Sequence, residues 1–176
     1  MLKKPKPLNH NAIHEAGHVI AALCFRLTVT AVLIKPSLKY AARCEISPTQ
    51  TVPIAVYGLK IAGSVAVDIQ NEKTSRNDDN GFGEITDLES DAASVDCIIR
   101  YWKNLSMTDE AIGTLADKWR ASVKQGLLEH WCTVEALAKK IAQLTLAAPS
   151  LSASEIGKIV RDTEPAFYEQ VKEHLQ

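Results

Sequence analysis

The stretch Asn11–Ile20, NAIHEAGHVI, places a histidine at position 14, a glutamate directly after it and a second histidine at position 18. Residues at this spacing lie one above the other on an α-helix, so both imidazoles would point from the same face. The run Val19–Phe25 that follows is wholly apolar. Asparagine side chains readily cap helix N-termini. We therefore expect Asn9 or Asn11 to begin a helix that becomes buried and ends near Phe25.

The arrangement His14-Glu15-Ala16-Gly17-His18 has the form HExxH. In this form two neutral imidazoles bind Zn²⁺, and the glutamate beside them accepts the proton of a water that the metal activates. Gly17 keeps the helix surface beside the second ligand free of a side chain. The alternative is a pair of histidines satisfied by ordinary contacts on a surface or in a core. A chance match can fall anywhere in a chain, whereas this one falls on a capped, increasingly apolar helix, which favours a metal site.

A catalytic zinc ion needs a third protein ligand and one open position for water. The longer pattern HExxHxxGxxH is not completed, because Ala21 and Cys24 stand where its glycine and last histidine belong. A helix that continues without that glycine points Cys24 away from the site, and neither His10 nor His130 has a suitable spacing. The third ligand is therefore expected among the downstream carboxylates, namely Glu72, Glu84, Asp87, Glu89 and Asp91.

The composition is that of an ordinary globular protein of one domain. The chain has 176 residues, 46% of them hydrophobic, and a formal net charge of -1 from 20 basic and 21 acidic residues. This balance argues against partners such as nucleic acid or a membrane surface. No apolar run is long enough to span a bilayer, and no secretory signal is recognisable. The four cysteines form no CxxC pair, so we expect reduced, mostly buried thiols in the cytoplasm.

The remaining segments predict a mainly helical fold with a small β element near the first helix. Two stretches rich in β-branched residues, Leu27–Ile34 and Lys39–Ile46, predict a β-hairpin. Pro53–Gln70 reads as a buried helix in which Gly58 and Gly63 allow close packing. A polar, glycine-containing loop, predicted to be mobile, follows over Asn71–Gly83.

Helical patterning resumes after this loop and continues to the end of the chain. Ser106-x-x-Asp109 and Ser152-x-x-Glu155 both resemble capping boxes, and Pro165 is suited to a first helical position. The expected helices run over Thr86–Trp102, Ser106–Gln125 and Leu127–Leu146, followed by a short one after Pro149 and a last one from Pro165. We expect residues 1–8 to form an extended arm and 9–176 a single domain, with a zinc-site half over 9–102 and a C-terminal helical half over 106–176.

The HEAGH segment resembles the zinc helix of the FtsH-type membrane proteases, in their peptidase domain. Further segments resemble this family in the same order along the chain, so the resemblance spans about His14 to Val160. They are Ile61–Asp68, which resembles the family's Ala-Gly-Arg-Ala-Ala-Glu; Gly83–Leu88, which resembles its Gly-Ala-x-Asn-Asp-Leu; Leu127–Trp131 and Val134–Ala138, which resemble its C-terminal helices; and Ser154–Ile156, at the start of its final short helix.

The resemblance implies a helical, zincin-like metallopeptidase domain in which Asp87 is the third zinc ligand beside His14 and His18, and Glu15 is the general base. Ser64, Val67 and Thr86 depart from the family's pattern. FtsH-type proteases also carry membrane spans and an ATPase module ahead of this domain. Here 13 residues precede the first zinc histidine and no GxxxxGK(S/T) phosphate loop occurs. ATP-driven unfolding is therefore not expected of this chain alone.

The expected activity is that of a stand-alone zinc metallopeptidase acting on flexible polypeptides, or working with a separate ATPase or adaptor. The strand near Val29–Ile34 would align a peptide by edge pairing. A second hypothesis is a catalytically silent, metallopeptidase-like domain that binds or regulates proteins. The intact Glu15 argues against it, since a domain without activity has no need of the base. A third is a purely structural helical domain in which HEAGH is fortuitous.

Overall fold

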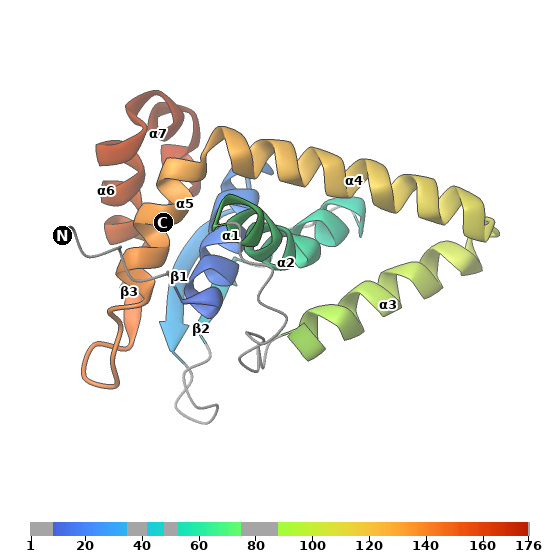
Figure 1. The fold of residues 1–176 in the computed structure, drawn as a ribbon, viewed down its shortest axis with the longest axis horizontal. Coiled ribbons are helices and arrows are strands. Elements are labelled where there is room, and N and C mark those ends of the chain that lie inside the picture. The colour runs from blue at the N-terminus through green and yellow to red at the C-terminus, as the bar shows by residue number, and fades with distance from the viewer. Residues whose placement is uncertain (1–8, 35–41, 48–52, 75–87, 176) are drawn as a thin grey trace.

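The computed structural model describes residues 9–34, 42–47, 53–74 and 88–175, and these residues form seven α-helices and three short strands (Figure 1). The first helix, α1 (His10–Cys24), carries the HEAGH segment. The side chain of Asn9 caps it by accepting a hydrogen bond from the backbone N–H of Asn11 at 2.9 Å. Every residue from Ala12 to Leu23 is buried. The predicted helix, its cap and its burial are thus confirmed.

The helix α2 (Pro53–Thr74) packs closely against α1. A Cβ atom added at Gly17 would lie 2.6 Å from the Cβ of Ala66 and 2.8 Å from the carbonyl oxygen of Ala62. Such distances are shorter than van der Waals contact, so only glycine allows the two backbones to approach this closely. Gly17 therefore serves helix packing. The helix α2 runs four residues further than predicted, to Thr74, and the rest of the predicted loop lies outside the described residues.

The β-sheet has three antiparallel strands in the order β2-β1-β3. The predicted hairpin is confirmed, because β1 (Val29–Ile34) pairs with β2 (Ala42–Ile46) and Val32 lies opposite Cys44. The third strand, β3 (Ser150–Ser152), was not predicted and places Leu151 opposite Val32 on the other side of β1. The expectation that β1 offers a free edge to a peptide is therefore wrong. The edge strand next to α1 is β2.

Two long helices, α3 (Leu88–Asn104) and α4 (Asp109–Glu129), form a hairpin that extends away from the sheet (Figure 1). The ring of Trp102 on α3 packs against Tyr57 on α2, with centroids 5.1 Å apart. The predicted cap of α4 is wrong: the side chain of Thr108, rather than that of Ser106, accepts a hydrogen bond from Ala111 N–H. Ser106 instead has a φ of 62°, in the left-handed region, within the turn.

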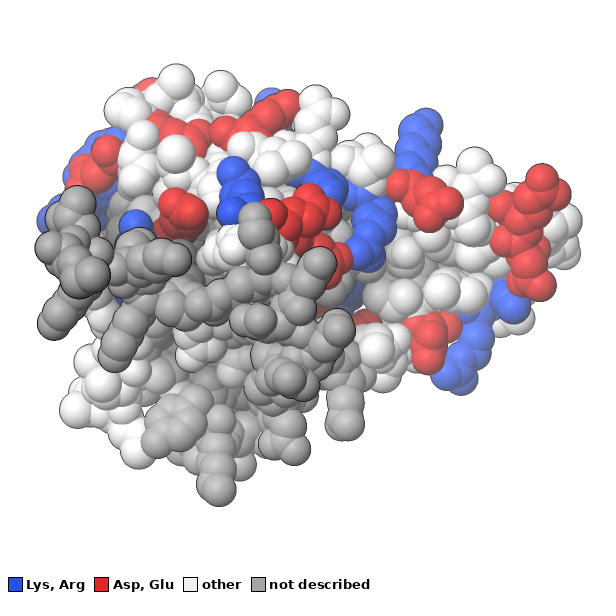
Figure 2. All heavy atoms as spheres, in the orientation of Figure 1, with Lys and Arg blue, Asp and Glu red and all other residues white. Residues whose placement is uncertain are grey.

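Ion pairs join α4 to α2 on the surface of this hairpin. Arg120 pairs with Asp68, and Lys124 Nζ lies 2.7 Å from Glu72 Oε1. Figure 2 shows acidic and basic side chains interleaved on this face of the molecule. Each exposed pair is worth at most about 1 kcal/mol. The main attachment of α4 is therefore apolar, through buried residues such as Ile112 and Leu127.

The C-terminal elements complete the core. The single helix predicted over Leu127–Leu146 is wrong, because His130 ends α4 and precedes a separate helix, α5 (Trp131–Ile141). The capping box of Ser152 and Glu155 is confirmed at the start of α6 (Ala153–Thr163), and Pro165 does begin α7 (Pro165–Val171). A 3₁₀ turn, η1 (Lys172–His174), follows. One hydrophobic cluster contains buried residues from α1, α2, β1, α5 and α6.

The four cysteines are free thiols, as expected, but the prediction that most are buried is wrong. Cys24, Cys97 and Cys132 are exposed, and Cys44 is partly buried. Within the described ranges, no helix combines the length and apolar character needed to cross a bilayer.

Candidate metal centre

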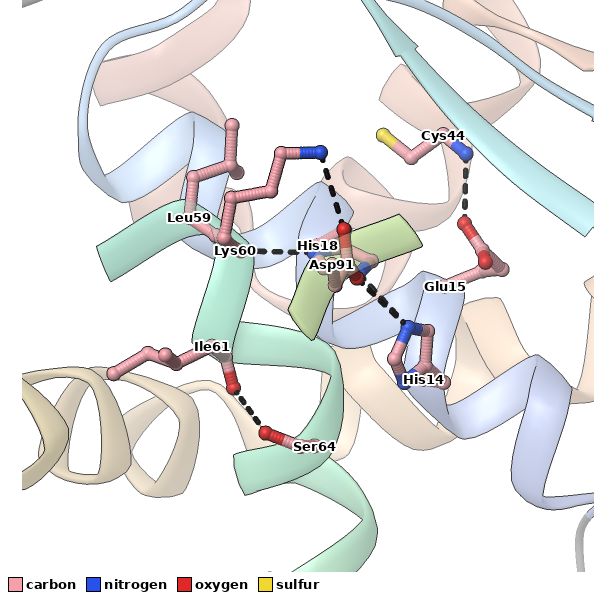
Figure 3. Close-up of polar contacts among 9 residues, drawn as sticks. All are labelled: His14, Glu15, His18, Cys44, Leu59, Lys60, Ile61, Ser64 and Asp91. Carbon is pink, nitrogen blue, oxygen red and sulfur yellow. Dashed lines mark hydrogen bonds and ion pairs between the residues drawn. The ribbon is translucent and has the colours of Figure 1, made fainter. Parts of the chain in front are cut away.

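Three side chains from α1 and α3 converge on one point (Figure 3). His18 Nε2 lies 2.9 Å from Asp91 Oδ2 and 3.0 Å from His14 Nε2, and His14 Nε2 lies 3.3 Å from the same carboxylate oxygen. The two histidines are one helical turn apart on α1, as the spacing predicts, and Asp91 comes from the first turn of α3. Among the described residues, these three form the cluster suited to a metal ion.

The geometry of this cluster fits a small tetrahedral ion. Ligand atoms about 2.0–2.1 Å from zinc at three corners of a tetrahedron lie roughly 3.3 Å from one another. The three observed separations are 2.9, 3.0 and 3.3 Å. Two imidazole nitrogens and one carboxylate oxygen are also a donor set that zinc accepts, and three protein ligands leave a fourth position open. The residues therefore fit a small metal ion such as zinc, with one coordination position left open.

Contacts from α2 orient His18 and Asp91. His18 Nδ1 lies 2.9 Å from the carbonyl oxygen of Leu59, which can only accept, so Nδ1 carries a proton. When the ring is neutral, its Nε2 lone pair therefore points at the cluster. Lys60 Nζ lies 3.1 Å from Asp91 Oδ1, the oxygen that faces away from the histidines. Such outer contacts typically set the tautomer and orientation of metal ligands.

The remaining residue of the cluster, His14, packs against Gly63, which lies one turn after Leu59 on α2. A Cβ added at Gly63 would lie 2.5–2.6 Å from three atoms of the His14 ring. The His14 side chain is buried, so the ring has little room to move aside. One turn of α2, Leu59–Gly63, therefore contacts all three residues of the cluster.

We predict that Gly63→Ala displaces the His14 ring, weakens zinc binding and lowers the free energy of unfolding by about 1–3 kcal/mol, the usual cost of overpacking. Gly113→Ala is the matched control, because a Cβ at this exposed position of α4 meets nothing within 4 Å. That change should raise the free energy of unfolding by about 0.5–1 kcal/mol. Chemical denaturation and zinc titration of both variants check this. Equal behaviour of the two variants would contradict the close packing seen at Gly63.

Glu15 lies beside the cluster rather than in it. Its side chain extends toward β2, where Glu15 Oε2 accepts a hydrogen bond from the backbone N–H of Cys44 at 2.7 Å (Figure 3). The residue is buried, and its charge acts on His18. The edge strand of the sheet thus holds the carboxylate that HExxH chemistry uses as a base, at a position adjacent to the histidines.

The electrostatics of the cluster favour a cation among its three donor atoms. Burial alone lowers the pKa of His18, but the hydrogen bond to Asp91 and the charges of Glu15 and Asp91 outweigh it, so the pKa is raised. Burial alone raises the pKa of Asp91, but hydrogen bonds from His14 and His18, the charge of His18 and the Lys60 ammonium hold it well below its usual range. A proton on His18 or a metal ion among the three side chains would supply the positive charge that the Asp91 carboxylate attracts.

Because a metal ion and this proton compete for His18, zinc affinity should depend on pH. Zinc needs the neutral imidazole, and the raised pKa keeps His18 protonated to a higher pH than usual. The apparent zinc affinity should therefore fall as the pH drops below that pKa, by roughly tenfold per pH unit for one displaced proton. Competition titrations from about pH 8 to about pH 6, corrected for the competing chelator, measure the slope. A flat profile would argue against displacement of a proton from His18.

The structure brings together His14, His18 and Asp91, with Glu15 adjacent. Asp87, the third ligand that the family resemblance implies, lies outside the described residues, as does Glu84, and the side chain of Glu89 is not described. Glu72 is paired with Lys124 on the surface. Cys24 is exposed, and His130 binds Glu164. Lys60 was not predicted to belong to the site. The sequence does contain a signal for it, because Lys60 is the one charged residue in Pro53–Val67.

No protein-family model matches this chain, and no curated protein matches its sequence.

Proposed function

We propose that this protein is a zinc-dependent metallopeptidase that hydrolyses peptide bonds without ATP on its own. The observation that carries the proposal is the convergence of His14, His18 and Asp91 beside Glu15. This is the donor set and the neighbouring carboxylate that the HExxH pattern requires. The resemblance of the HEAGH segment to FtsH-type peptidase domains supports the same activity and a zincin-like fold.

Each residue has a definite role in this proposal. His14, His18 and Asp91 would hold the ion. Zinc bound there lowers the pKa of a water and polarises a carbonyl group. Glu15 would take the proton from the water and pass it to the leaving amine. The hydrogen bond from Cys44 N–H keeps the Glu15 carboxylate in place beside the cluster.

The sheet edge next to Glu15 suggests how a substrate would be aligned. Among the described residues, β2 pairs with β1 alone, and Cys44 N–H points from the other side of β2 to Glu15. An extended peptide added along that side would lie next to the base. We therefore assign substrate alignment to β2 and expect flexible segments or short peptides as substrates.

The test combines metal content with cleavage. Purified protein should contain about one zinc per chain and should cleave an unfolded substrate such as casein without ATP. A chelator should abolish cleavage, and added zinc should restore it. Zinc bound without cleavage of any peptide in a broad panel would instead support the protein-binding alternative. Failure to bind zinc even after reconstitution would overturn the proposal.

A further inference from the structure

Lys60 is an isolated cation on an otherwise apolar stretch of α2. It is the one charged residue in Pro53–Val67, and its side chain is about two-thirds buried, at 32% exposure. Its Nζ lies 3.1 Å from Asp91 Oδ1. A lysine held in this way loses conformational freedom and part of its hydration. The contact with Asp91 is what offsets that loss.

The two oxygens of Asp91 have different partners (Figure 3). Oδ2 faces His14 and His18, whereas Oδ1 faces Lys60. A carboxylate can bind a cation through one oxygen or through both, and larger ions such as Ca²⁺ often take both. With Oδ1 engaged by an ammonium group, Asp91 presents a single oxygen to the histidines.

The backbone of α2 places Lys60 directly after the residue that contacts His18. Lys60 follows Leu59, whose carbonyl oxygen accepts the hydrogen bond from His18 Nδ1. The same peptide segment therefore orients His18 and Asp91 relative to each other.

We propose that Lys60 is a positioning residue that keeps Asp91 Oδ1 out of the metal coordination, so that the cluster offers three donor atoms and one open position. This inference rests on the proposed zinc site and extends it to metal selectivity. Three donors, two of them nitrogen, suit a small tetrahedral ion such as zinc. A second carboxylate oxygen would favour larger, oxygen-preferring ions such as Mn²⁺ or Ca²⁺.

The test uses Lys60→Met, Lys60→Arg and a matched control, Lys118→Met, which removes the charge of an exposed lysine on α4. Zinc and manganese dissociation constants are measured by competition with a coloured chelator. Lys60→Met should weaken zinc binding by about 10- to 100-fold, as loss of an outer contact to a ligand typically does. It should weaken manganese binding less. Lys60→Arg, which keeps a donor to Oδ1, should recover much of the zinc affinity.

The visible spectrum of the Co²⁺-loaded protein gives a second readout. Wild type should show the intense bands of a four-coordinate ion, and Lys60→Met should show weaker bands because a second Asp91 oxygen joins the ion. If Lys60→Met melts below the assay temperature, Lys60→Leu replaces it, since it also removes the donor to Oδ1 and is apolar.

The outcomes separate this inference from the proposed function. If wild type binds zinc, and Lys60→Met has the same zinc affinity and Co²⁺ spectrum, then Lys60 has no positioning role, while the zinc site stands. If Lys118→Met weakens zinc binding as much as Lys60→Met, the effect is one of overall charge and the inference is wrong. If wild type binds no zinc, the proposed function itself fails.

Discussion

Glu15→Gln is expected to slow peptide hydrolysis by about 10²–10⁴-fold, the usual contribution of a general base, while zinc stays bound. The amide of glutamine has nearly the shape of the carboxylate, and its oxygen can still accept the hydrogen bond from Cys44 N–H that the structure shows. It cannot take a proton from water at neutral pH. The rate constant for cleavage of a fluorogenic peptide and the zinc content per chain, measured on the same preparation, check both halves of this expectation.

The matched control is Glu110→Gln, which changes an exposed glutamate in the first turn of α4. It alters the net charge equally and should leave the cleavage rate close to that of wild type. Should Glu15→Gln retain full activity, Glu15 cannot be the base, and the role assigned to the HEAGH segment would be limited to holding the metal.

Asp91→Asn is expected to weaken zinc binding by more than the roughly 10- to 100-fold that loss of an outer contact typically costs. The change keeps the size of the side chain but removes the charge from the oxygen that lies 2.9 Å from His18 Nε2 and 3.3 Å from His14 Nε2. Without that charge, two imidazoles remain as strong donors, which is one fewer than a catalytic zinc site needs. Titration of the metal-free variant with zinc measures the loss.

Two other aspartates make this experiment decisive. Asp96→Asn changes an exposed residue on the same helix and should leave zinc binding unchanged. Asp87→Asn tests the ligand that the family resemblance implies, four residues before Asp91 in the sequence. Strong loss of zinc in Asp87→Asn together with normal binding in Asp91→Asn would assign the third ligand to Asp87 and contradict the proposal that Asp91 binds the ion.

The helix α1 could be predicted almost completely from the sequence, because the residues that determine it lie within the helix or next to it. The cap at Asn9, the one-turn spacing of His14 and His18, and the apolar run after them all act within α1. The hairpin of β1 and β2 is local as well, and its pairing is confirmed. Hydrophobic pattern and residue propensity were therefore sufficient to predict the elements whose structure depends on neighbouring residues.

The proposed third ligand depends on distant contacts, so residue spacing could only narrow the choice to a set of carboxylates, of which the family resemblance favoured Asp87. Asp91 was among five downstream carboxylates, but spacing could not select it. Which carboxylate of α3 faces the histidines depends on where that helix begins and on how Trp102 packs against Tyr57. The contact of Lys60 with Asp91 could not be predicted from the sequence either, because it depends on how α2 and α3 pack together.

The other failures have the same cause. The three residues of β3 are too few to show a period, yet they convert β1 from an edge strand into the central one. A helix break was predicted between Gln125 and Leu127, but α4 continues to Glu129 and the break lies at His130. Ser106 satisfied the capping pattern as well as Thr108 does, and the turn geometry decided between them.

The pairing of β1 with β3 affects when the protein can fold during its synthesis. Val32 finds its partner Leu151 119 residues later in the sequence, and α1, which carries the histidines, packs against α5 of the same late region. Contacts of such long range form slowly and require nearly the whole chain. During synthesis, the centre is therefore expected to stay unassembled until the last helices have left the ribosome, so a growing chain would bind zinc poorly. A chain truncated before Ser150 should show the same defect.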